Sequence, residues 1–360
     1  ITMRKRRKEN TEYTQYSLFE SEIATDHCDA PVHETGILDF FSWLPNEEDP
    51  MDFFEIASSS GKPGETSDIG LSSNYSDTSS SYFDIDDNEN PRNYIIENDN
   101  IGVGSPKVRF NNNIAAIKLL LKLETEDRAP SSEECSILSQ YVGWGGLANA
   151  FDKEKWPSEY DELKNLLTES EYTSARSSVL SSFYTSPKII RAMWNKLVDF
   201  GFKSGNVLEP CCAIGNFFGC IPPEINANLY GVELDSISSR IAKKLYPAAD
   251  IRNIGFEDTH FSNGFFDVVI GNVPFGDYSI DDERYKGIGK LLIHDYFLIK
   301  SLDLCRGGGI IALITTSGTM DKKNSSVRNQ LAKRASFIGA IRLPETAFKS
   351  AAGTSVVSDI

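Results

Sequence analysis

The sequence has few metal-binding side chains and none of them at paired ligand spacing. It holds 4 histidines and 6 cysteines in 360 residues, and no two cysteines form a Cys-x-x-Cys pair. Structural zinc sites need such paired ligands, so we expect no metal site. The cysteines are typical of reduced thiols in a cytosolic protein.

Two further absences argue against whole classes of protein. No apolar run reaches the roughly 20 residues that cross a bilayer, so no membrane span is expected. The chain also lacks the Gly-x-x-x-x-Gly-Lys-Ser/Thr loop that binds nucleoside triphosphates, and its small-residue turn "EPCCAIG" is not the Gly-x-Gly-x-x-Gly of dinucleotide-binding proteins. Neither an ATPase nor a hydride-transfer enzyme of those types is therefore indicated.

Positive charge is scarce at the start of the chain. The first 106 residues hold 7 lysines and arginines against 22 aspartates and glutamates, whereas the whole chain holds 36 against 52, so the remainder is nearly neutral. Such a Ser-, Asp- and Asn-rich segment buries too little apolar surface to offset its ordering entropy, so we predict residues 1–106 to be mostly disordered. Within it, the aromatic and acidic stretch Gly36–Ile56 is typical of a segment that docks on a partner or on its own chain.

A small helical module is predicted over residues 107–181. Its first helix would start at Asn111, capped by that asparagine, and end before Pro130. Ser131 and Glu134 have the spacing of a capping box at the start of a second helix. Two shorter helices complete the module.

From residue 182 onward, strands and helices alternate, which indicates an α/β fold with a parallel sheet. Strands are predicted at residues 206–210, 228–234, 250–253, 265–272, 307–316 and 337–344. Helices are predicted at residues 187–200, 236–245, 294–305 and 327–335. The last residues, "GTSVVSDI", read as the start of a further strand, so we expect the domain at 182–360 to be truncated at its C-terminus.

Polar residues follow three of these strands, at the edge where open α/β sheets bind ligands. Glu209 ends the first strand and precedes a turn of small residues that closes with Gly215. Glu233 ends the next strand, where a carboxylate can accept both hydroxyls of a ribose. A later strand ends in "GNVPFG", which places the amide of Asn272 beside a proline and an aromatic ring. The pattern predicts a nucleotide-type ligand site.

Four motifs follow one another along the chain: "FYTSP", "EPCCAIGNF", "GVELD" and "GNVPF". These motifs and their order resemble those of S-adenosylmethionine-dependent N6-adenine DNA methyltransferases with the γ arrangement of motifs. With "YVGWGGLANAFD" and "AIRLPETAFK", they look most like the methylase portion of large methylase–helicase proteins of bacterial plasmids, phages and integrative elements. The resemblance implies a Rossmann-like class I methyltransferase sheet with helices on both faces. It also implies S-adenosylmethionine as cofactor, DNA as partner, a helicase region continuing C-terminally, and a cytoplasmic protein encoded by a bacterium, phage or plasmid.

The resemblance assigns the catalytic role to the turn formed by Asn272, Val273, Pro274 and Phe275. The Asn272 side chain and the Val273 carbonyl would accept the two hydrogens of an adenine N6 group. Phe275 and Phe348 would stack on the two faces of that base after it has left the duplex. Methyl transfer would be direct, with positioning as the main catalytic device.

The resemblance also assigns the cofactor site. The methionine end would contact Tyr184, Thr185 and Pro187, and its amino-acid part would contact the turn with Glu209, Pro210, Ala213 and Gly215. Glu233 would bind the ribose, and Phe256 and Glu257 would border the adenine. Two positions depart from the usual pattern. Ala213 stands where the family has glycine, and its methyl group is expected to crowd the cofactor or to force an unfavourable φ angle. Val273 stands where most members have proline, which preserves the carbonyl that the chemistry uses.

Three functions remain open on the sequence. The primary prediction is N6-adenine methylation of DNA for a mobile genetic element, which would protect that DNA from restriction. A catalytically weak or inactive module of the same fold would bind DNA or a protein partner. An amino-methyltransferase acting on protein or RNA would use the same Asn-x-Pro-aromatic turn.

Overall fold

The computed structural model describes residues 92–180, 184–344, 347–348 and 357–360. The predicted acidic segment lies almost entirely outside these residues, and its docking stretch Gly36–Ile56 lies wholly outside them. All described residues fall within one compact unit, Asp84–Ile360. None of the helices in these ranges is both long and apolar enough to span a membrane.

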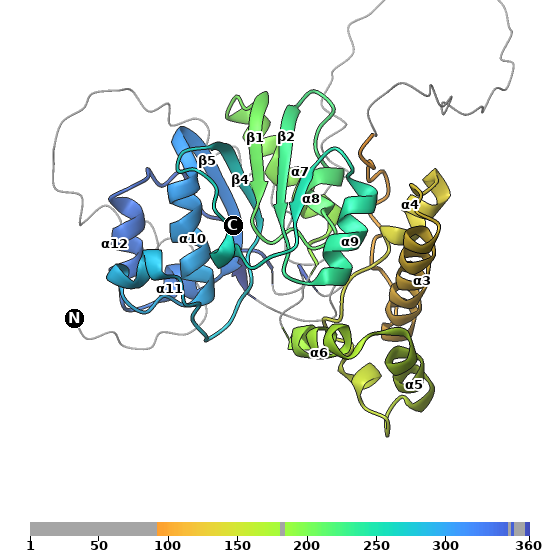
Figure 1. Cartoon of the computed structure of the whole chain (residues 1–360). Coiled ribbons are helices and arrows are strands. Elements are labelled where there is room, and N and C mark those ends of the chain that lie inside the picture. Colours follow the sequence, from red (N-terminus) through yellow and green to blue (C-terminus); the bar gives the residue numbers. More distant parts are fainter. Residues whose placement is uncertain (1–91, 181–183, 345–346, 349–356) are drawn as a thin grey trace, which may run out of the picture. The chain divides into compact units, whose positions relative to one another are not determined.

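A six-stranded sheet in the order β3-β2-β1-β4-β5-β6 forms the centre of the structure (Figure 1). The first five strands are parallel, and β6 pairs with β5 in the antiparallel sense. The strands are β1 (Ser204–Glu209), β2 (Asn226–Val232), β3 (Asp250–Arg252), β4 (Phe266–Asn272), β5 (Cys305–Thr316) and β6 (Ser358–Asp359). The predicted α/β, Rossmann-like fold is confirmed, with a mixed rather than wholly parallel sheet.

Helices cover both faces of the sheet, as predicted (Figure 1). Val207 and Val268 are buried in the core on one face, and the next residues, Leu208 and Val269, are buried in the core on the other. Strands covered on both faces are expected to be continuously apolar, as these are. One side carries α7 (Pro187–Asp199), α8 (Asn216–Gly219) and α9 (Ser236–Leu245), and the other α10 (Ile293–Leu304) and α12 (Ser326–Ala332), with α11 (Gly318–Asp321) after β5.

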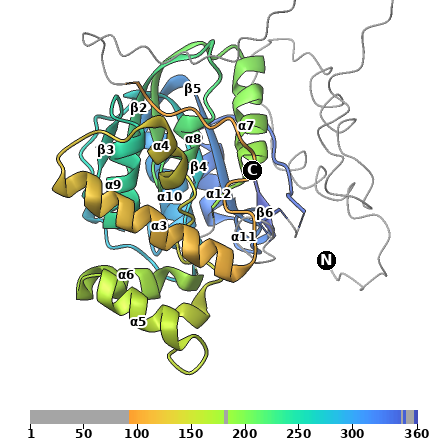
Figure 2. The ribbon, with the colours of Figure 1, turned by 90° about the vertical axis from the view of Figure 1, so that its right-hand side faces the viewer.

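A helical segment, residues 106–180, packs on the outer side of α9 (Figure 2). It comprises α3 (Pro106–Thr125), α4 (Ser132–Leu138), η2 (Ala148–Phe151), α5 (Pro157–Leu166), α6 (Glu169–Ser177) and η3 (Ser178–Leu180). The predicted capping box is confirmed, because the Ser131 hydroxyl accepts from the N–H of Glu134 and the Glu134 side chain accepts from the N–H of Ser131. The division into three domains stays a prediction.

The predicted asparagine cap of the first helix is wrong. The helix begins earlier, at Pro106, and Ser105 is its N-cap. Asn113 lies inside the helix and is fully buried, where its amide donates to the carbonyl of Gly143 at 2.6 Å and accepts from the N–H of Val142 at 2.9 Å. The amide therefore satisfies the backbone of the glycine-rich turn rather than the start of its own helix.

The predicted strand at 337–344 is also wrong. Phe337 and Ile338 are more than half exposed, and pairing is confined to the end of this stretch. There, Ile341 and Ile360 exchange backbone hydrogen bonds of 3.0 and 2.9 Å. A strand needs a partner along its whole length, and the available partner, β6, is two residues long.

The packed part of the chain begins before residue 106, where the sequence predicted the end of the disordered segment. The N–H of Tyr94 donates to the carbonyl of Leu245, and the N–H of Ile96 donates to the carbonyl of Gly219, both at 2.8 Å. The Ile96 side chain is 3% exposed and belongs to the core beside α8 and α9. Part of the stretch predicted as disordered thus packs on the α/β fold.

Candidate active site

The strand order reverses at β1, which lies between β2 and β4. Open α/β sheets bind ligands at such a point, beside the carboxyl ends of the strands. Glu209 is the last residue of β1, Glu233 directly follows β2, and Asn272 is the last residue of β4. The structure thus brings the three polar residues singled out in the sequence to one edge of the sheet.

A tight turn connects β1 to α8. Ala213 and Gly215 both have left-handed backbone, with φ angles of 48° and 86°. Glycine is required at position 215, because a Cβ atom there would lie 2.6 Å from the ring of Tyr246. The unfavourable φ expected of Ala213 is confirmed, yet the turn keeps its shape, and the N–H of Ala213 donates to Glu233 Oε2 at 2.8 Å.

Replacing Ala213 by glycine should relieve the strain at this position. A left-handed φ costs a residue with a side chain about 1–2 kcal/mol, and glycine removes this cost. Part of the gain in stability is lost again, because glycine gives the unfolded chain more conformational freedom. We expect Ala213→Gly to be up to about 1 kcal/mol more stable than the wild type in urea unfolding. Ala227→Gly in β2, where the backbone is extended, should instead lose stability. A clear loss in both variants would contradict the strained turn.

Glu209 is buried, with 2% of its surface exposed. Among the described residues, none forms a hydrogen bond with its Oε2 atom. Burial, and secondarily the charge of Glu233, raises the pKa of Glu209 well above its usual value. A buried carboxyl oxygen in this state is costly, and a cationic ligand group would satisfy it. The ammonium of the predicted cofactor fits this position.

Glu233 is held by two backbone N–H groups. Besides the bond from Ala213, its Oε1 accepts from the N–H of Asp235 at 2.7 Å. The side chain of Asn253 donates to the carbonyl of Glu233 at 2.8 Å and holds the turn in place. Burial, and then the charge of Asp235, raises the pKa of Glu233 to about 7. The carboxylate lies between the two turns, where a ribose-binding acid is predicted.

The "YTSP" element is joined to the other motifs by side-chain hydrogen bonds. Asn272 Nδ2 donates to Thr185 Oγ1 at 3.2 Å, across 87 positions of sequence. The hydroxyl of Tyr184 lies 3.4 Å from Ser238 Oγ at the start of α9. Tyr184 and Thr185 are buried, and Pro187 is the first residue of α7. The four motifs that carry the resemblance therefore meet in space.

The turn after β4 carries the predicted catalytic residues. The backbone N–H of Val273 donates to the carbonyl of Ile314 in β5 at 3.1 Å, and its side chain is 2% exposed. Pro274 and Phe275 are half-buried, and Phe275 contacts the cores on both faces of the sheet. The valine thus attaches the turn to the sheet, which holds the amide and the ring on a rigid support.

Phe348, predicted to stack on the second face of the base, is buried. Its ring is 1% exposed and belongs to the core that also contains residues of α7 and α9. A buried ring can stack on a base only after it becomes accessible. Its role as the second stacking residue stays a prediction.

The turn η4 (Phe256–Asp258), predicted to border the cofactor adenine, follows β3. Phe256 is buried against Phe297, with ring centroids 4.8 Å apart. The guanidinium of Arg284 donates to the carbonyls of Glu257 and Thr259, the latter at 2.9 Å. Arg284 lies in η5 (Glu283–Ile288), so this turn is tied to the loop that follows the catalytic residues.

A buried lysine that the sequence analysis did not single out supports the same turn. Lys300 of α10 is 1% exposed, and its ammonium donates to the carbonyl of Phe256 and lies 3.7 Å from Asp282 Oδ2. Burial lowers the pKa of Lys300 to about 8. Its signal in the sequence is that Lys300 is the one charged residue in the stretch "YFLIKSL".

Replacing Lys300 by methionine should destabilise the chain by about 2–4 kcal/mol. The substitution keeps the length of the side chain but leaves the Phe256 carbonyl without its donor and removes one cation beside Asp282. Urea unfolding measures the loss. Lys290→Met, at an exposed position before α10, is the control and should stay within about 0.5 kcal/mol of the wild type. Equal stability of the two variants would contradict a supporting role for Lys300.

Within the described ranges, no group of three His, Cys, Asp or Glu side chains is placed to bind a metal ion. The sheet order, the two acids and the asparagine turn together form the arrangement predicted for a class I S-adenosylmethionine-dependent methyltransferase. Comparison with known proteins finds similarity to methylases of restriction-modification systems. Residues 246–348 match the model of the Eco57I restriction-modification methylase family, and this range contains the turn at Asn272.

The chain is also similar to two curated proteins. The chain is 28% identical over 267 residues to "Defense against restriction protein B" of Escherichia phage P1, a match that covers 72% of this chain and 10% of the phage protein. It is 30% identical over 156 residues to "Modification methylase CviBIII" of Paramecium bursaria Chlorella virus NC1A, a match that covers 40% of each chain. The chain therefore spans a minor part of the length of both relatives.

Several solved structures align with part of this chain. A class I S-adenosylmethionine-dependent methyltransferase of Listeria monocytogenes aligns with a TM-score of 0.45 and 15% identity, covering 70% of this chain and 86% of that one. The modification subunit of a type I restriction enzyme from Vibrio vulnificus YJ016 aligns with a TM-score of 0.41 and 17% identity, covering 58% and 49%.

Proposed function

We propose that this chain transfers a methyl group from S-adenosylmethionine to the N6 amino group of adenine in DNA. The observation that carries the proposal is the hydrogen bond between Asn272 and Thr185, which joins the asparagine turn to the cofactor motifs. The match to the restriction-modification methylase family includes this turn. One edge of the sheet would then hold the cofactor and, beside it, the acceptors for an amino group.

The residues at this edge fit the cofactor, which supplies a methyl group on a positively charged sulfonium. Glu209 would accept a hydrogen bond from the ammonium and balance its charge, which relieves the cost of the buried carboxyl. Glu233, oriented by two N–H groups, would accept the ribose hydroxyls. The other predicted residues would complete the walls of the site: Tyr184, Thr185, Pro187, Pro210, Ala213, Gly215, Phe256 and Glu257.

The asparagine turn suits a weakly nucleophilic amino group. The lone pair of adenine N6 is delocalised into the ring, so the site must favour a tetrahedral nitrogen. Asn272 Oδ1 and the Val273 carbonyl would accept the two hydrogens and direct the lone pair toward the methyl group. Because N6 cannot be reached inside the stacked duplex, the adenine would be flipped out and would stack on Phe275. Positioning is then the main catalytic device, and no covalent intermediate with the chain is needed.

Transfer of tritiated methyl groups into duplex DNA, RNA and protein tests the proposal. We expect the label in DNA, recovered as N6-methyladenine after digestion to nucleosides. Label recovered as a methylated cytosine, or found in RNA or protein and not in DNA, would overturn the adenine assignment. Cofactor binding without any transfer would favour an inactive module that binds DNA or a partner.

We further propose that the methylation serves a mobile genetic element in the cytoplasm of a bacterial host. The printed name of the phage P1 relative describes defence against restriction. The resemblance to methylase–helicase proteins makes a helicase region the partner that we propose. Plasmid DNA methylated by the chain should transform a restricting host more efficiently than the same plasmid left unmethylated. Equal efficiency across a panel of restricting hosts would contradict the protective role.

A further inference from the structure

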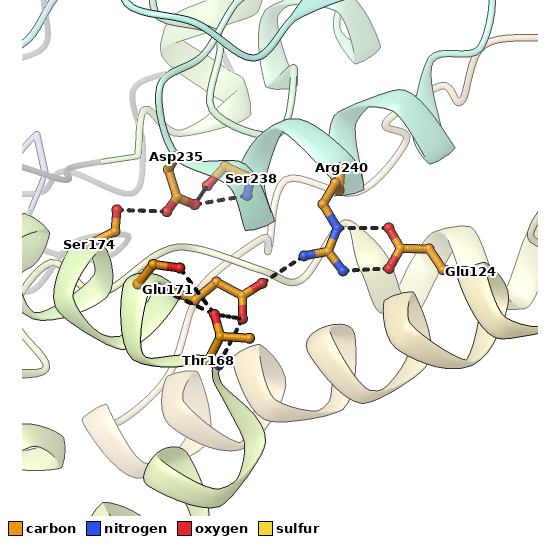
Figure 3. Close-up of polar contacts among 8 residues, drawn as sticks. Glu124, Thr168, Glu171, Ser174, Asp235, Ser238 and Arg240 are labelled. Carbon is orange, nitrogen blue, oxygen red and sulfur yellow. Dashed lines mark hydrogen bonds and ion pairs between the residues drawn. The ribbon is translucent and has the colours of Figure 1, made fainter.

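Arg240 of α9 links the α/β fold to two helices of the helical segment (Figure 3). Its Nε donates to Glu124 Oε1 of α3 at 2.7 Å, and its Nη2 pairs with the second oxygen of the same carboxylate. Its Nη1 donates to Glu171 Oε1 of α6 at 2.7 Å. A planar guanidinium that is bidentate to one acid and bonded to another fixes the relative positions of three helices.

Glu171 is itself held rigidly. It is the third residue of α6. Its Oε2 accepts from the N–H of Thr168 at 2.9 Å, and its own N–H donates to the Thr168 hydroxyl at 3.3 Å, which together form a capping box. The Glu171 side chain is 15% exposed, and that of Arg240 is 29% exposed. Partial burial strengthens the pair relative to an exposed ion pair. Arg240 therefore sets the position of α6 against α9.

One turn further along α6, Ser174 reaches the site described above (Figure 3). Its hydroxyl donates to Asp235 Oδ1 at 3.2 Å, while Asp235 Oδ2 caps α9 by accepting from the N–H of Ser238 at 2.9 Å. The backbone N–H of Asp235 donates to Glu233 Oε1. A continuous series of contacts thus runs from the helical segment to the carboxylate assigned to the ribose.

We propose that the helical segment is part of the cofactor site, and that Ser174 and Arg240 are positioning residues that set the affinity for the ribose through the Glu233–Asp235 turn. The inference rests on the ribose role proposed for Glu233. Orienting a carboxylate toward two hydroxyls requires a fixed turn, and Asp235 is fixed from both sides, by α9 through one oxygen and by α6 through the other. Loss of the α6 contact leaves the turn held from one side.

The ratio of affinities for adenosine and 2′,3′-dideoxyadenosine tests this inference in the full chain. Both compounds would compete with labelled S-adenosylmethionine, and the second lacks the hydroxyls that Glu233 would accept. We expect the wild type to prefer adenosine, and Ser174→Ala to reduce that preference about three- to tenfold. The control, Ser177→Ala, removes an exposed hydroxyl from the same helix, where it bonds to the carbonyl of Ser174, and should keep the wild-type ratio.

Arg240→Met should reduce the preference as well, and Arg240→Lys should restore part of it, because lysine keeps the charge but not the bidentate fork. The matched control is Lys118→Met, which breaks the exposed pair between α3 and Glu162 at 2.7 Å. Lower thermal stability with an unchanged ratio in Ser174→Ala and in both Arg240 variants would show a purely structural role and overturn the inference. A wild type that binds the two compounds equally well would refute the ribose role of Glu233 and, with it, this inference. The proposed DNA methylation would not be refuted by that result, because the methyl-transfer assay tests it separately.

Discussion

Replacing Asn272 by alanine is expected to lower kcat for methyl transfer by about 10²–10³-fold. Alanine cannot accept a hydrogen from the adenine amino group, so the nitrogen lone pair loses the interaction that directs it. Affinity for S-adenosylmethionine should change little, because Glu209 and Glu233 lie at the ends of two other strands, β1 and β2. Transfer of tritiated methyl groups into duplex DNA measures kcat, and calorimetric titration measures the affinity.

The matched control for this variant is Asn228→Ala. Asn228 lies near the start of β2, away from the carboxyl ends of the strands, and its amide donates to Asn206 Oδ1 at 3.0 Å. The same loss of an amide from the same sheet should leave kcat at the wild-type value. Retained activity in Asn272→Ala would refute the assigned catalytic turn. Lost cofactor binding in that variant would show that Asn272 acts through its contact with Thr185.

The central strands and the polar residues that end them could be predicted because both follow from local pattern. Buried parallel strands are apolar on both faces, as at Val207–Leu208 and Val268–Ile270, and they stop at the first polar side chain. Parallel strands place those ends at one edge of the sheet, so Glu209 and Asn272 were expected there. The positive φ of Ala213 followed from its replacing a glycine in the turn.

Contacts between distant segments could not be predicted in this way. Asparagine is favoured at helix N-termini, so a cap was the local interpretation of the Asn111 region, but Asn113 bonds to backbone 29 and 30 positions away. Burial of Lys300 depends on the Phe256 carbonyl, which is 44 positions away in sequence. Arg240 meets Glu124 across 116 positions. Each of these polar groups is stabilised by a partner that is distant in the sequence, which local sequence patterns cannot identify.

Replacing Glu209 by glutamine is expected to weaken binding of S-adenosylmethionine about 10- to 100-fold. The amide keeps the size of the side chain but loses the charge that would face the ammonium, and a hydrogen bond to a charged group is worth about 1.5–3 kcal/mol. Calorimetric titration of the full chain measures the affinity. Glu224→Gln, at an exposed position before β2, is the control and should bind as the wild type does. Unchanged affinity in Glu209→Gln would refute the ammonium role.

The same variant should also change how stability depends on pH. The pKa of Glu209 in the folded chain lies well above 4.5, so the folded chain keeps a proton that the unfolded chain releases. The stability that this proton contributes is therefore full below about pH 4.5 and is lost as the pH rises toward the raised pKa of Glu209. Glu233 makes stability fall with rising pH in the same way, up to about pH 7. We expect Glu209→Gln to be more stable than the wild type at neutral pH without cofactor, and its unfolding free energy to vary less with pH. Urea unfolding over this range measures both, and a wild type whose stability rises throughout it would contradict a protonated, buried Glu209.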